Sequence, residues 1–565
     1  MGNMARTVGI GIQSFEKIRE NQCFYVDKTP FIKEWWENQD EVTLLARPRR
    51  FGKTLTMSMV EQFFSTRYAN RGELFQGLSL WENESYRRLQ GTYPVISFSF
   101  ANVKENTYEK VRYRMCQILR DLYVQNRFLL EGDLLTPGEK DYFNRISETM
   151  KEEDATMSIH YLSVFLNRYY GKKVIILLDE YDTPMQEAYV NGYWEELVSF
   201  TRSLFNSTFK TNPSLERAIM TGITRVSRES IFSDLNHLKV VTTTSEEYAD
   251  SFGFTEEEVF AALDEYGMSD KKSEVKKWYD GFTFGRQTDI YNPWSIINYL
   301  DTGRITTYWA NSSSNSLVGT LIREGDRDVK QKLERLMQGE EIRVEMEEQI
   351  VYGELRTKRN AVWSLLLASG YLRVLRVEDL EKEDRCYYTL VLTNREVRRM
   401  FGNMIQGWFA EQDSSYNDFI KALLLGDLDA MNDYMNHVSH CIFSYFDTGK
   451  GPSGTEPERF YHGFVLGLMV ELEGRYRLTS NRESGFGRYD VMLEPLKPQD
   501  DALILEFKVF QPRKEKELSD TVQAALKQIE EKRYEMELQS RGIQPERIRK
   551  YGVAFQGKQV LIGEA

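Results

Sequence analysis

A short segment with the sequence RPRRFGKT, Arg47–Thr54, has the residue types of a phosphate-binding loop. In the pattern GxxxxGK[ST], backbone N–H groups surround phosphate oxygens at the start of a helix, the Lys reaches the β and γ oxygens, and the Ser/Thr hydroxyl binds magnesium. Gly52, Lys53 and Thr54 fit, whereas Arg47 stands where the first Gly is expected. A chance GKT in a basic turn is the alternative. The predicted nucleotide-contacting residues are Arg49, Arg50, Phe51, Gly52, Lys53, Thr54 and Leu55.

An apolar run that ends in carboxylates, Val174–Asp182 (VIILLDEYD), supplies a second set of candidates. A carboxylate at the C-terminal edge of a parallel strand can face a phosphate loop and hold Mg²⁺. Asp179 is therefore the predicted magnesium ligand beside Thr54, and Glu180 is the predicted base that orients the attacking water. Asp182 is assigned a structural or supporting role. An ordinary acidic exit from a strand is the alternative interpretation.

A third segment, Met220–Arg228 (MTGITRVSR), can complete a nucleotide site. Thr221 lies at the end of an expected strand, where a polar side chain can sense the γ-phosphate. Arg225 and Arg228 can supply the cation that stabilises charge in phosphoryl transfer, either within the chain or to a neighbouring copy. An oligomer is compatible with the second arrangement. For either Arg, a solvated position at the start of a helix is the alternative.

Near the C-terminus, Asp490, Glu506 and Lys508 form a carboxylate–lysine set. Alternate residues of a strand share a face, so Glu506 and Lys508 point the same way while Phe507 enters the opposite side. Charges on an apolar strand are costly unless they are paired or bind a metal. Asp490 and Glu506 are the predicted Mg²⁺ ligands. Lys508 is predicted to orient or help deprotonate a water that attacks a phosphodiester.

The same residues also have a simpler interpretation. Glu506 and Lys508 can form a structural ion pair at a sheet edge. Asp490 on a neighbouring strand and the order of the surrounding elements favour the metal site. Glu458 on a preceding helix and Gln528 on a following helix are predicted to add outer contacts.

The elements that must position the first three segments have the pattern of a parallel sheet. Buried apolar runs separated by helical segments indicate strands that are covered on both faces. The segment after Lys53 is expected to be helical. These features predict an α/β domain over residues 1–240. The predicted strands are Val42–Ala46, Pro94–Phe100, Val174–Leu178 and Arg217–Ile223.

The middle of the chain, residues 241–454, has a different pattern. A helix over Asn360–Gly370 is followed by two β-rich runs, Tyr371–Val377 and Cys386–Leu392, which suggests a winged-helix-like module. Met400–Phe446 is mostly helical by periodicity. The run TGKGPSGTEP, Thr448–Pro457, is rich in Gly and Pro and marks a boundary. We therefore expect a helical lid and connector over this range.

Residues 455–565 are predicted to form a domain with the order αβββαβ, the arrangement of restriction endonucleases. The expected elements are a helix Glu458–Leu472, strands Arg475–Ser480, Tyr489–Leu493 and Ala502–Val509, a helix Lys516–Gln539 and a final strand Arg549–Phe555.

Composition narrows the class of protein. The 565 residues carry a formal net charge of −13 and a pI near 5.3, so any nucleic-acid contact must be local, because phosphate binding is largely electrostatic. Four Cys without CxxC pairing argue against a zinc ribbon or a disulfide framework. Apolar runs of about 18 residues and a signal-peptide core are lacking, so a cytoplasmic protein without a membrane span is expected.

Several longer segments resemble known families. The N-terminal VGIGIQSFEKIRENQCFYVDKTPFIKEWW, with LLARPRRFGKTLTMSM and ILLDEYDTP, is similar to the bacterial AAA-ATPase-like family, in which RPRRFGKT is the usual loop. The segments FYHGFVLGLM, SNRESGFGRYDVML and LILEFKV resemble the companion PD-(D/E)XK nuclease-superfamily domain. The resemblance implies nucleotide roles for Lys53, Thr54, Asp179 and Glu180. It implies nuclease roles for Asp490, Glu506 and Lys508.

Together these features predict an enzyme that binds and hydrolyses ATP with Mg²⁺. The N-terminal domain would be coupled to a metal-dependent nuclease that acts on nucleic acid, with DNA favoured over RNA. The alternative is a nucleotide-gated binding or signalling module whose nuclease-like domain is an inactive scaffold, which the acidic composition favours.

Overall fold

The computed structural model describes most of the chain. The described residues are 5–223, 232, 235, 237–310, 318–319, 321–322, 327–346, 360–380, 385–409, 416–443, 469, 472, 475–480, 483–484, 487–488, 490–556 and 559–565.

The chain divides into two compact units. The first comprises residues 1–324 and 343–397, and the second comprises residues 325–342 and 398–565. Much of the expected lid therefore belongs to the same compact unit as the N-terminal sheet, and the three-part division remains a prediction. None of the helices in the described ranges is long and apolar enough to cross a bilayer.

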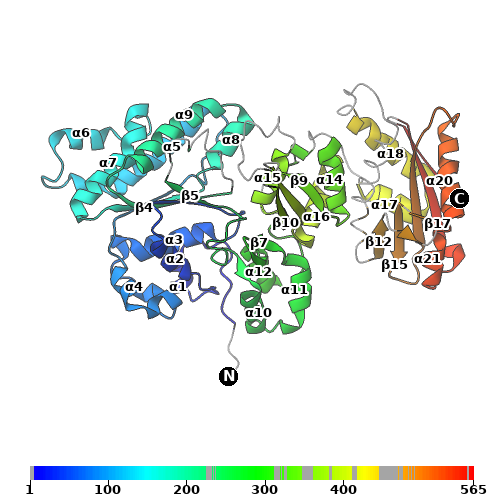
Figure 1. The fold of residues 1–565 in the computed structure, drawn as a ribbon, viewed down its shortest axis with the longest axis horizontal. Helices are drawn as coiled ribbons and strands as arrows, with labels where there is room; N and C mark the ends of the chain where they lie inside the picture. Colours follow the sequence, from blue (N-terminus) through cyan, green and yellow to red (C-terminus); the bar gives the residue numbers. More distant parts are fainter. Residues whose placement is uncertain are drawn as a thin grey trace. The chain divides into compact units, whose positions relative to one another are not determined.

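The first unit is built on a five-stranded parallel sheet with the order β2-β3-β4-β1-β5 (Figure 1). All of its strand pairs are parallel, and β1 and β3 are buried along their whole length, because helices cover both faces. The four predicted strands and the parallel α/β sheet are confirmed. The strands are β1 (Val42–Ala46), β2 (Val95–Ser99), β3 (Val174–Asp179), β4 (Leu215–Gly222) and β5 (Leu238–Val241).

Two groups of helices enclose this sheet (Figure 1). One face carries α1 (Phe15–Glu20), α2 (Pro30–Asn38), α3 (Lys53–Phe64) and α4 (Glu84–Leu89). The other carries α5 (Tyr108–Gln125), α6 (Pro137–Arg145), α7 (Glu152–Tyr170), α8 (Thr183–Asn191) and α9 (Trp194–Phe205). The sheet is therefore the middle layer of three, with helices packed on both of its faces.

A small antiparallel sheet follows in the same unit, with the order β6-β8-β7. The run Tyr279–Pro293 is rich in turn residues, yet it contains the β7–β8 hairpin, whose strands are too short to show a clear alternation. Its elements are β6 (Phe254–Thr255), α10 (Glu256–Glu265), α11 (Lys272–Tyr279), β7 (Phe282–Phe284), β8 (Gln287–Tyr291) and α12 (Pro293–Thr302).

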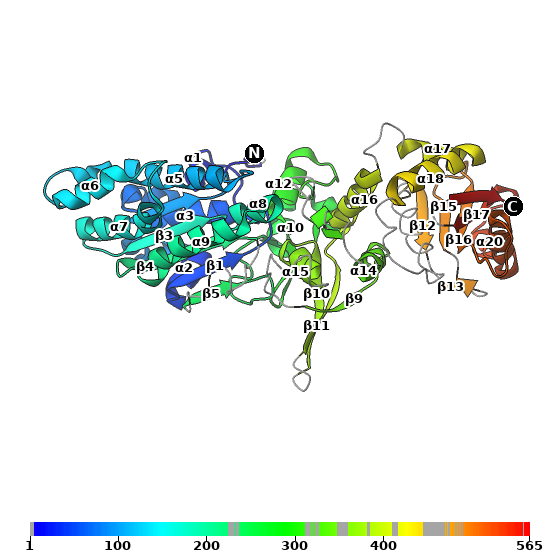
Figure 2. The ribbon, with the colours of Figure 1, turned by 90° about the horizontal axis from the view of Figure 1, so that it is seen from above.

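The expected helix followed by a hairpin is also present, as α15 (Ala361–Ala368), β10 (Leu372–Leu380) and β11 (Arg385–Leu392). In Figure 2 the hairpin extends away from α15. Its second strand also pairs with β9 (Ile342–Glu345), which gives the order β10-β11-β9. The winged-helix-like assignment stays a proposal.

The second unit contains a mixed five-stranded sheet with the order β12-β15-β16-β17-β18. Only β16 and β17 are parallel. Its strands are β12 (Tyr476–Ser480), β15 (Val491–Pro495), β16 (Ala502–Val509), β17 (Ile548–Gln556) and β18 (Gln559–Glu564), with a separate short pair β13 (Glu483–Ser484) and β14 (Gly487–Arg488). The strand β18 is an addition to the predicted order, and the predicted helix Glu458–Leu472 lies almost wholly outside the described residues.

Helices cover both faces of this sheet. One core joins alternate strand residues such as Leu505 and Phe507 to α17 and α18, and the other joins Ala502 and Ile504 to the helices after β16. Phe507 thus faces away from Glu506 and Lys508, as the strand period requires. The helices of this part of the chain are α14 (Arg327–Met337), α16 (Arg395–Phe409), α17 (Tyr416–Leu425), α18 (Leu428–Phe443), α20 (Leu518–Lys532) and α21 (Glu535–Ser540).

One glycine allows two segments of the first unit to meet. Gly281 has φ +128°, and a Cβ built on it would lie 2.0 Å from the carbonyl oxygen of Thr393. Gly267 also has a positive φ, +70°, but its Cβ would meet nothing within 4 Å.

We expect Gly281→Ala to destabilise the protein by about 2–5 kcal/mol, because backbone strain and overpacking combine. Gly267→Ala, which introduces strain alone, is expected to cost about 1 kcal/mol. Thermal denaturation of both variants tests this difference, and equal melting temperatures would contradict the close contact.

Candidate functional site

The phosphate-loop segment connects β1 to α3, as predicted. Gly52 precedes the first residue of α3 with φ +83°, and Arg50 adopts φ +65°. The N–H groups of Arg50 through Leu55 donate to no other group within the described part of the chain. A run of such N–H groups at a helix start forms a concave site for anions.

Lys53 lies beneath this loop as the first residue of α3. Its side chain is buried, and Nζ donates to the carbonyl oxygens of Arg47 and Pro48, each at 2.8 Å. Burial lowers the pKa of Lys53, and the nearby carboxylates of Glu180 and Asp179 oppose that change. The ammonium is therefore already positioned at the loop by main-chain contacts.

Arg47 takes a structural position. Its guanidinium is buried and donates to the carbonyl oxygens of Thr242, Glu247 (3.0 Å) and Tyr248 (3.4 Å), and it lies 4.5 Å from the ring centre of Phe284. Burial lowers its pKa to about 9. An Arg replaces the generic first Gly here because its side chain ties the end of β1 to the segment that follows β5.

Three strand and helix ends meet at Asp179. Thr54 Oγ1 donates to Asp179 Oδ2 at 2.7 Å, and Thr221 Oγ1 donates to Asp179 Oδ1. The Asp179 side chain is buried, which raises its pKa, while both hydroxyls lower it. Residues from α3, β3 and β4 thus converge, although they are far apart in the sequence. Oxygen ligands of this kind fit Mg²⁺.

The residues after Asp179 turn sharply. Glu180 has φ +52°, its N–H donates to Thr221 Oγ1 at 3.1 Å, and its carboxylate accepts from Thr183 Oγ1 at 3.0 Å. Asp182 Oδ2 accepts from the N–H of Ile223 at 3.0 Å and so joins this turn to β4. Arg225 and Arg228 lie outside the described residues.

The side chains of the loop itself are held by neighbours. Arg49 donates to Gln186 Oε1 at 3.0 Å, and Arg50 lies 4.2 Å from the ring centre of Trp294. Phe51 is buried against the edges of Phe282 and Phe284, with ring centres 4.8 and 5.4 Å away. Leu55 is half-buried on α3. The side chains of Arg49, Arg50 and Phe51 therefore contact neighbouring residues, and the backbone N–H groups from Arg50 onward are left as donors for a ligand.

The second set of candidates lies on two adjacent strands. Val491 of β15 pairs with Leu505 of β16, so the next antiparallel position places Asp490 opposite Glu506. Asp490 Oδ2 accepts from the N–H of Phe507 at 2.8 Å, and Glu506 is only 3% exposed. The structure thus brings both carboxylates to one face of the sheet.

A glutamine from α20 joins this set. Lys508 Nζ donates to Gln528 Oε1 at 2.6 Å, while Gln528 Nε2 donates to Glu506 Oε1 and to the hydroxyl of Tyr534 at 3.3 Å. The amide therefore bridges the carboxylate and the ammonium. Sequence analysis missed Tyr534, because a tyrosine in a charged helical segment carries no signal for this contact. Glu458 lies outside the described residues.

The pair of Asp490 and Glu506 fits a hard divalent cation. Two carboxylates share one face beside a lysine, and a buried carboxylate is stabilised by a cation. Carboxylate oxygens suit Mg²⁺, Ca²⁺ or Mn²⁺.

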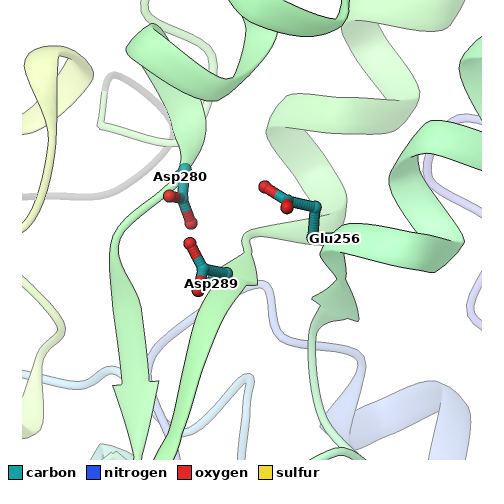
Figure 3. A group of neighbouring side chains, drawn as sticks. All are labelled: Glu256, Asp280 and Asp289. Carbon is teal, nitrogen blue, oxygen red and sulfur yellow. The ribbon is translucent and has the colours of Figure 1, made fainter.

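A third group of carboxylates lies in the β6-β8-β7 region. Glu256, Asp280 and Asp289 direct their oxygens toward one another (Figure 3). Lys276 Nζ pairs with Glu256 and, at 3.1 Å, with Asp289, and Tyr291 donates to Glu256 at 3.2 Å. Burial, and then the charge of Asp289, raise the pKa of Asp280 to about 7. Lys276 therefore supplies positive charge to this group, and burial favours the protonated form of Asp280.

Comparisons with known proteins agree with this architecture. Residues 9–232 match a family model described as a predicted AAA-ATPase, and residues 456–565 match the PD-(D/E)XK nuclease superfamily. The protein therefore has an N-terminal AAA-ATPase-like domain and a C-terminal domain of the PD-(D/E)XK nuclease superfamily, which confirms the resemblance of its segments.

One known protein is similar to this chain over almost the whole length of both. An uncharacterized protein in the vnfD 5′ region of Azotobacter chroococcum mcd 1 is 25% identical over 556 residues, which cover 97% of this chain and 96% of that protein. The similarity therefore extends across the residues of both domains, in chains of nearly equal length.

The shifted pKa of Asp280 predicts a pH dependence of stability. Its pKa in the folded state, about 7, exceeds the ordinary value of 3.8, so its contribution is complete below pH 4 and is lost as pH rises through 7. We expect Asp280→Asn, which mimics the protonated acid, to melt higher than wild type at pH 8, with a difference that shrinks as pH falls toward 4.

Asp301→Asn, an exposed position at the end of α12, is the matched control and should follow wild type at both pH values. Thermal denaturation between pH 5 and 8 measures the effect. Parallel plots of melting temperature against pH for wild type and Asp280→Asn would contradict the raised pKa of Asp280.

Proposed function

We propose that the protein binds and hydrolyses ATP with Mg²⁺ in its first unit and cleaves phosphodiesters of nucleic acid in its second. DNA is the favoured substrate. We also propose a cytoplasmic location, since Cys23, Cys116 and Cys386 are free thiols among the described residues.

The uncapped N–H groups of Arg50 through Leu55 carry the nucleotide proposal. They are donors for the phosphate oxygens, and Lys53 supplies a positive charge beside them. Thr54 and Asp179 are the proposed ligands of Mg²⁺, which offsets the charge of the phosphates when it is bound. Glu180, whose turn is fixed by Thr221, is the proposed base that orients water for attack on the γ-phosphate.

The shared face of Asp490, Glu506 and Lys508 supports the nuclease proposal. Asp490 and Glu506 would hold Mg²⁺, which stabilises the charge that develops on the phosphate. Lys508 is kept in place by Gln528 and is the proposed group that orients the attacking water. Asp490 is itself fixed by the N–H of Phe507.

The loop that follows Lys508 supplies a local basic surface. Arg513, Lys514 and Lys516 are exposed. The two acidic residues among them, Glu515 and Glu517, have hydrogen-bond partners in α20. Glu515 accepts from Thr521, and Glu517 caps the helix. A chain with a net charge of −13 therefore still presents cations in the loop that follows Lys508, and we propose that this loop contacts the phosphate backbone.

The acidic composition favours the second candidate, a nucleotide-gated binding module with an inactive nuclease scaffold. The two candidates differ in one observable, metal-dependent cleavage.

Wild type, Lys53→Ala and Asp490→Asn together test the proposed function. Cleavage of single- and double-stranded DNA and RNA is measured with Mg²⁺ or Mn²⁺, with and without ATP, and ATP turnover is measured in parallel. We expect Lys53→Ala to reduce ATP turnover at least 100-fold, and Asp490→Asn to abolish cleavage while turnover persists.

Two surface variants serve as controls, Lys277→Ala in the first unit and Asp429→Asn in the second, since both side chains are exposed. Cleavage that survives Asp490→Asn would contradict the nuclease site. Cleavage that Lys53→Ala also abolishes would establish coupling between the units. ATP turnover without cleavage by wild type under any condition would favour the binding module.

The second prediction concerns the basic loop. We expect each of Arg513→Gln, Lys514→Gln and Lys516→Gln to weaken DNA binding and to lower the slope of log affinity against log salt by about 1. Lys497→Gln removes an exposed cation beyond the opposite end of β15 and should leave the slope unchanged. Fluorescence anisotropy in Ca²⁺, at several salt concentrations, measures binding. Equal slopes for all four variants would exclude this loop from the interface.

A further inference from the structure

Two side chains from outside the phosphate loop converge on one of its carbonyl groups. Trp309 Nε1 donates to the carbonyl oxygen of Arg49 at 3.0 Å, and Asn292 Nδ2 donates to the same oxygen at 3.3 Å. The carbonyl has two lone pairs, so both hydrogen bonds can form together. The orientation of the peptide group between Arg49 and Arg50 is therefore set by residues about 250 positions later in the chain.

This orientation determines where a phosphate donor points. The C=O and N–H of a trans peptide point in opposite directions. With the Arg49 carbonyl directed at Trp309 and Asn292, the N–H of Arg50 is directed away from them, and it donates to nothing within the described ranges. This N–H is the first of the donors in the proposed phosphate site.

The loop conformation is costly without such support. Arg50 has φ +65°, and a left-handed backbone conformation is strained for a non-glycine residue. Its guanidinium lies over Trp294, 4.2 Å from the ring centre, and so adds a second tie on the same side. A phosphate loop that holds a non-glycine residue in this conformation therefore depends on contacts from α12 and the segment after it.

The two donors are themselves held firmly. Asn292 caps α12, since its Oδ1 accepts from the N–H groups of Trp294 at 2.9 Å and Ser295 at 3.3 Å. This leaves its Nδ2 directed at the loop. Trp309 is 1% exposed, so its indole cannot turn away.

A buried carboxylate fixes the backbone around Trp309. Glu396, fully buried, accepts from the N–H groups of Tyr308 at 2.6 Å, Trp309 at 2.7 Å and Ala310 at 3.4 Å, and from Ser295 Oγ at 2.7 Å. One carboxylate thus joins α12 to the segment that carries the indole.

We propose that Asn292 and Trp309 are positioning residues for nucleotide binding, which they serve by turning the Arg50 N–H toward the phosphates. Glu396 supports them by holding Trp309 and Ser295. This inference rests on the proposed function and deepens it, because it assigns phosphate recognition to residues that lie outside the phosphate-loop motif.

The test measures the affinity of the full-length protein for Mg·ATP and for inorganic tripolyphosphate by calorimetry. Trp309→Phe keeps an aromatic ring but removes the N–H donor. Asn292→Ser keeps an oxygen that can cap α12 but removes the amide donor. We expect each variant to bind both ligands about three- to tenfold more weakly, the effect of losing one hydrogen bond.

Trp363→Phe is the matched control. Trp363 is also fully buried in the first unit, but its Nε1 has no hydrogen-bond partner within the described residues. We expect this variant to lose thermal stability as Trp309→Phe does, yet to bind ATP and tripolyphosphate like wild type. A merely structural role for Trp309 would lower the melting temperature without a selective loss of affinity.

The outcomes are distinct. Wild-type affinity in folded Trp309→Phe and Asn292→Ser would overturn the positioning role while the proposed function stands. If Trp309→Phe does not fold, the affinity of Asn292→Ser decides. A wild-type protein that binds neither ligand would overturn the proposed nucleotide function, and this inference with it.

Discussion

The first unit depends on a loop whose backbone donors cannot be satisfied from within. The N–H groups of Arg50 through Leu55 face no acceptor in the described protein, and Arg50 is held in a left-handed conformation. Such a loop persists only where neighbours over-determine it. Lys53 donates to the carbonyl oxygen of Arg47, and the Arg47 side chain donates to Thr242. Trp309 and Asn292 donate to the carbonyl oxygen of Arg49.

The second unit meets a comparable constraint with a different solution. Glu506 is buried on a strand whose same face carries the apolar residues Ala502 and Ile504, so its charge must be balanced by polar groups. The Gln528 amide donates a hydrogen bond to Glu506 and accepts one from Lys508. It therefore lies between two opposite charges that could otherwise form a direct ion pair. The carboxylate and the ammonium are therefore both held in place by the same amide.

The lid region shows how aromatic runs acquire a role through packing. The aromatic runs Trp278–Phe282 and Tyr291–Trp294 pack in the structure, since Phe282 lies against Phe51 and Trp294 against Arg50. Their contacts fall on the phosphate loop. The region that follows the sheet in sequence therefore helps to shape the phosphate loop, and much of it belongs to the same compact unit.

The sequence by itself determined the parallel sheet, the loop between β1 and α3, and the shared face of Glu506 and Lys508, because local periodicity and motif spacing encode them. Only the tertiary structure decided that Thr54 and Thr221 meet at Asp179, and that Trp309 reaches Arg49. The short strands β5, β7 and β8 escaped prediction for the same reason. Their residues are specified by long-range pairing, which leaves no periodic signal along the chain.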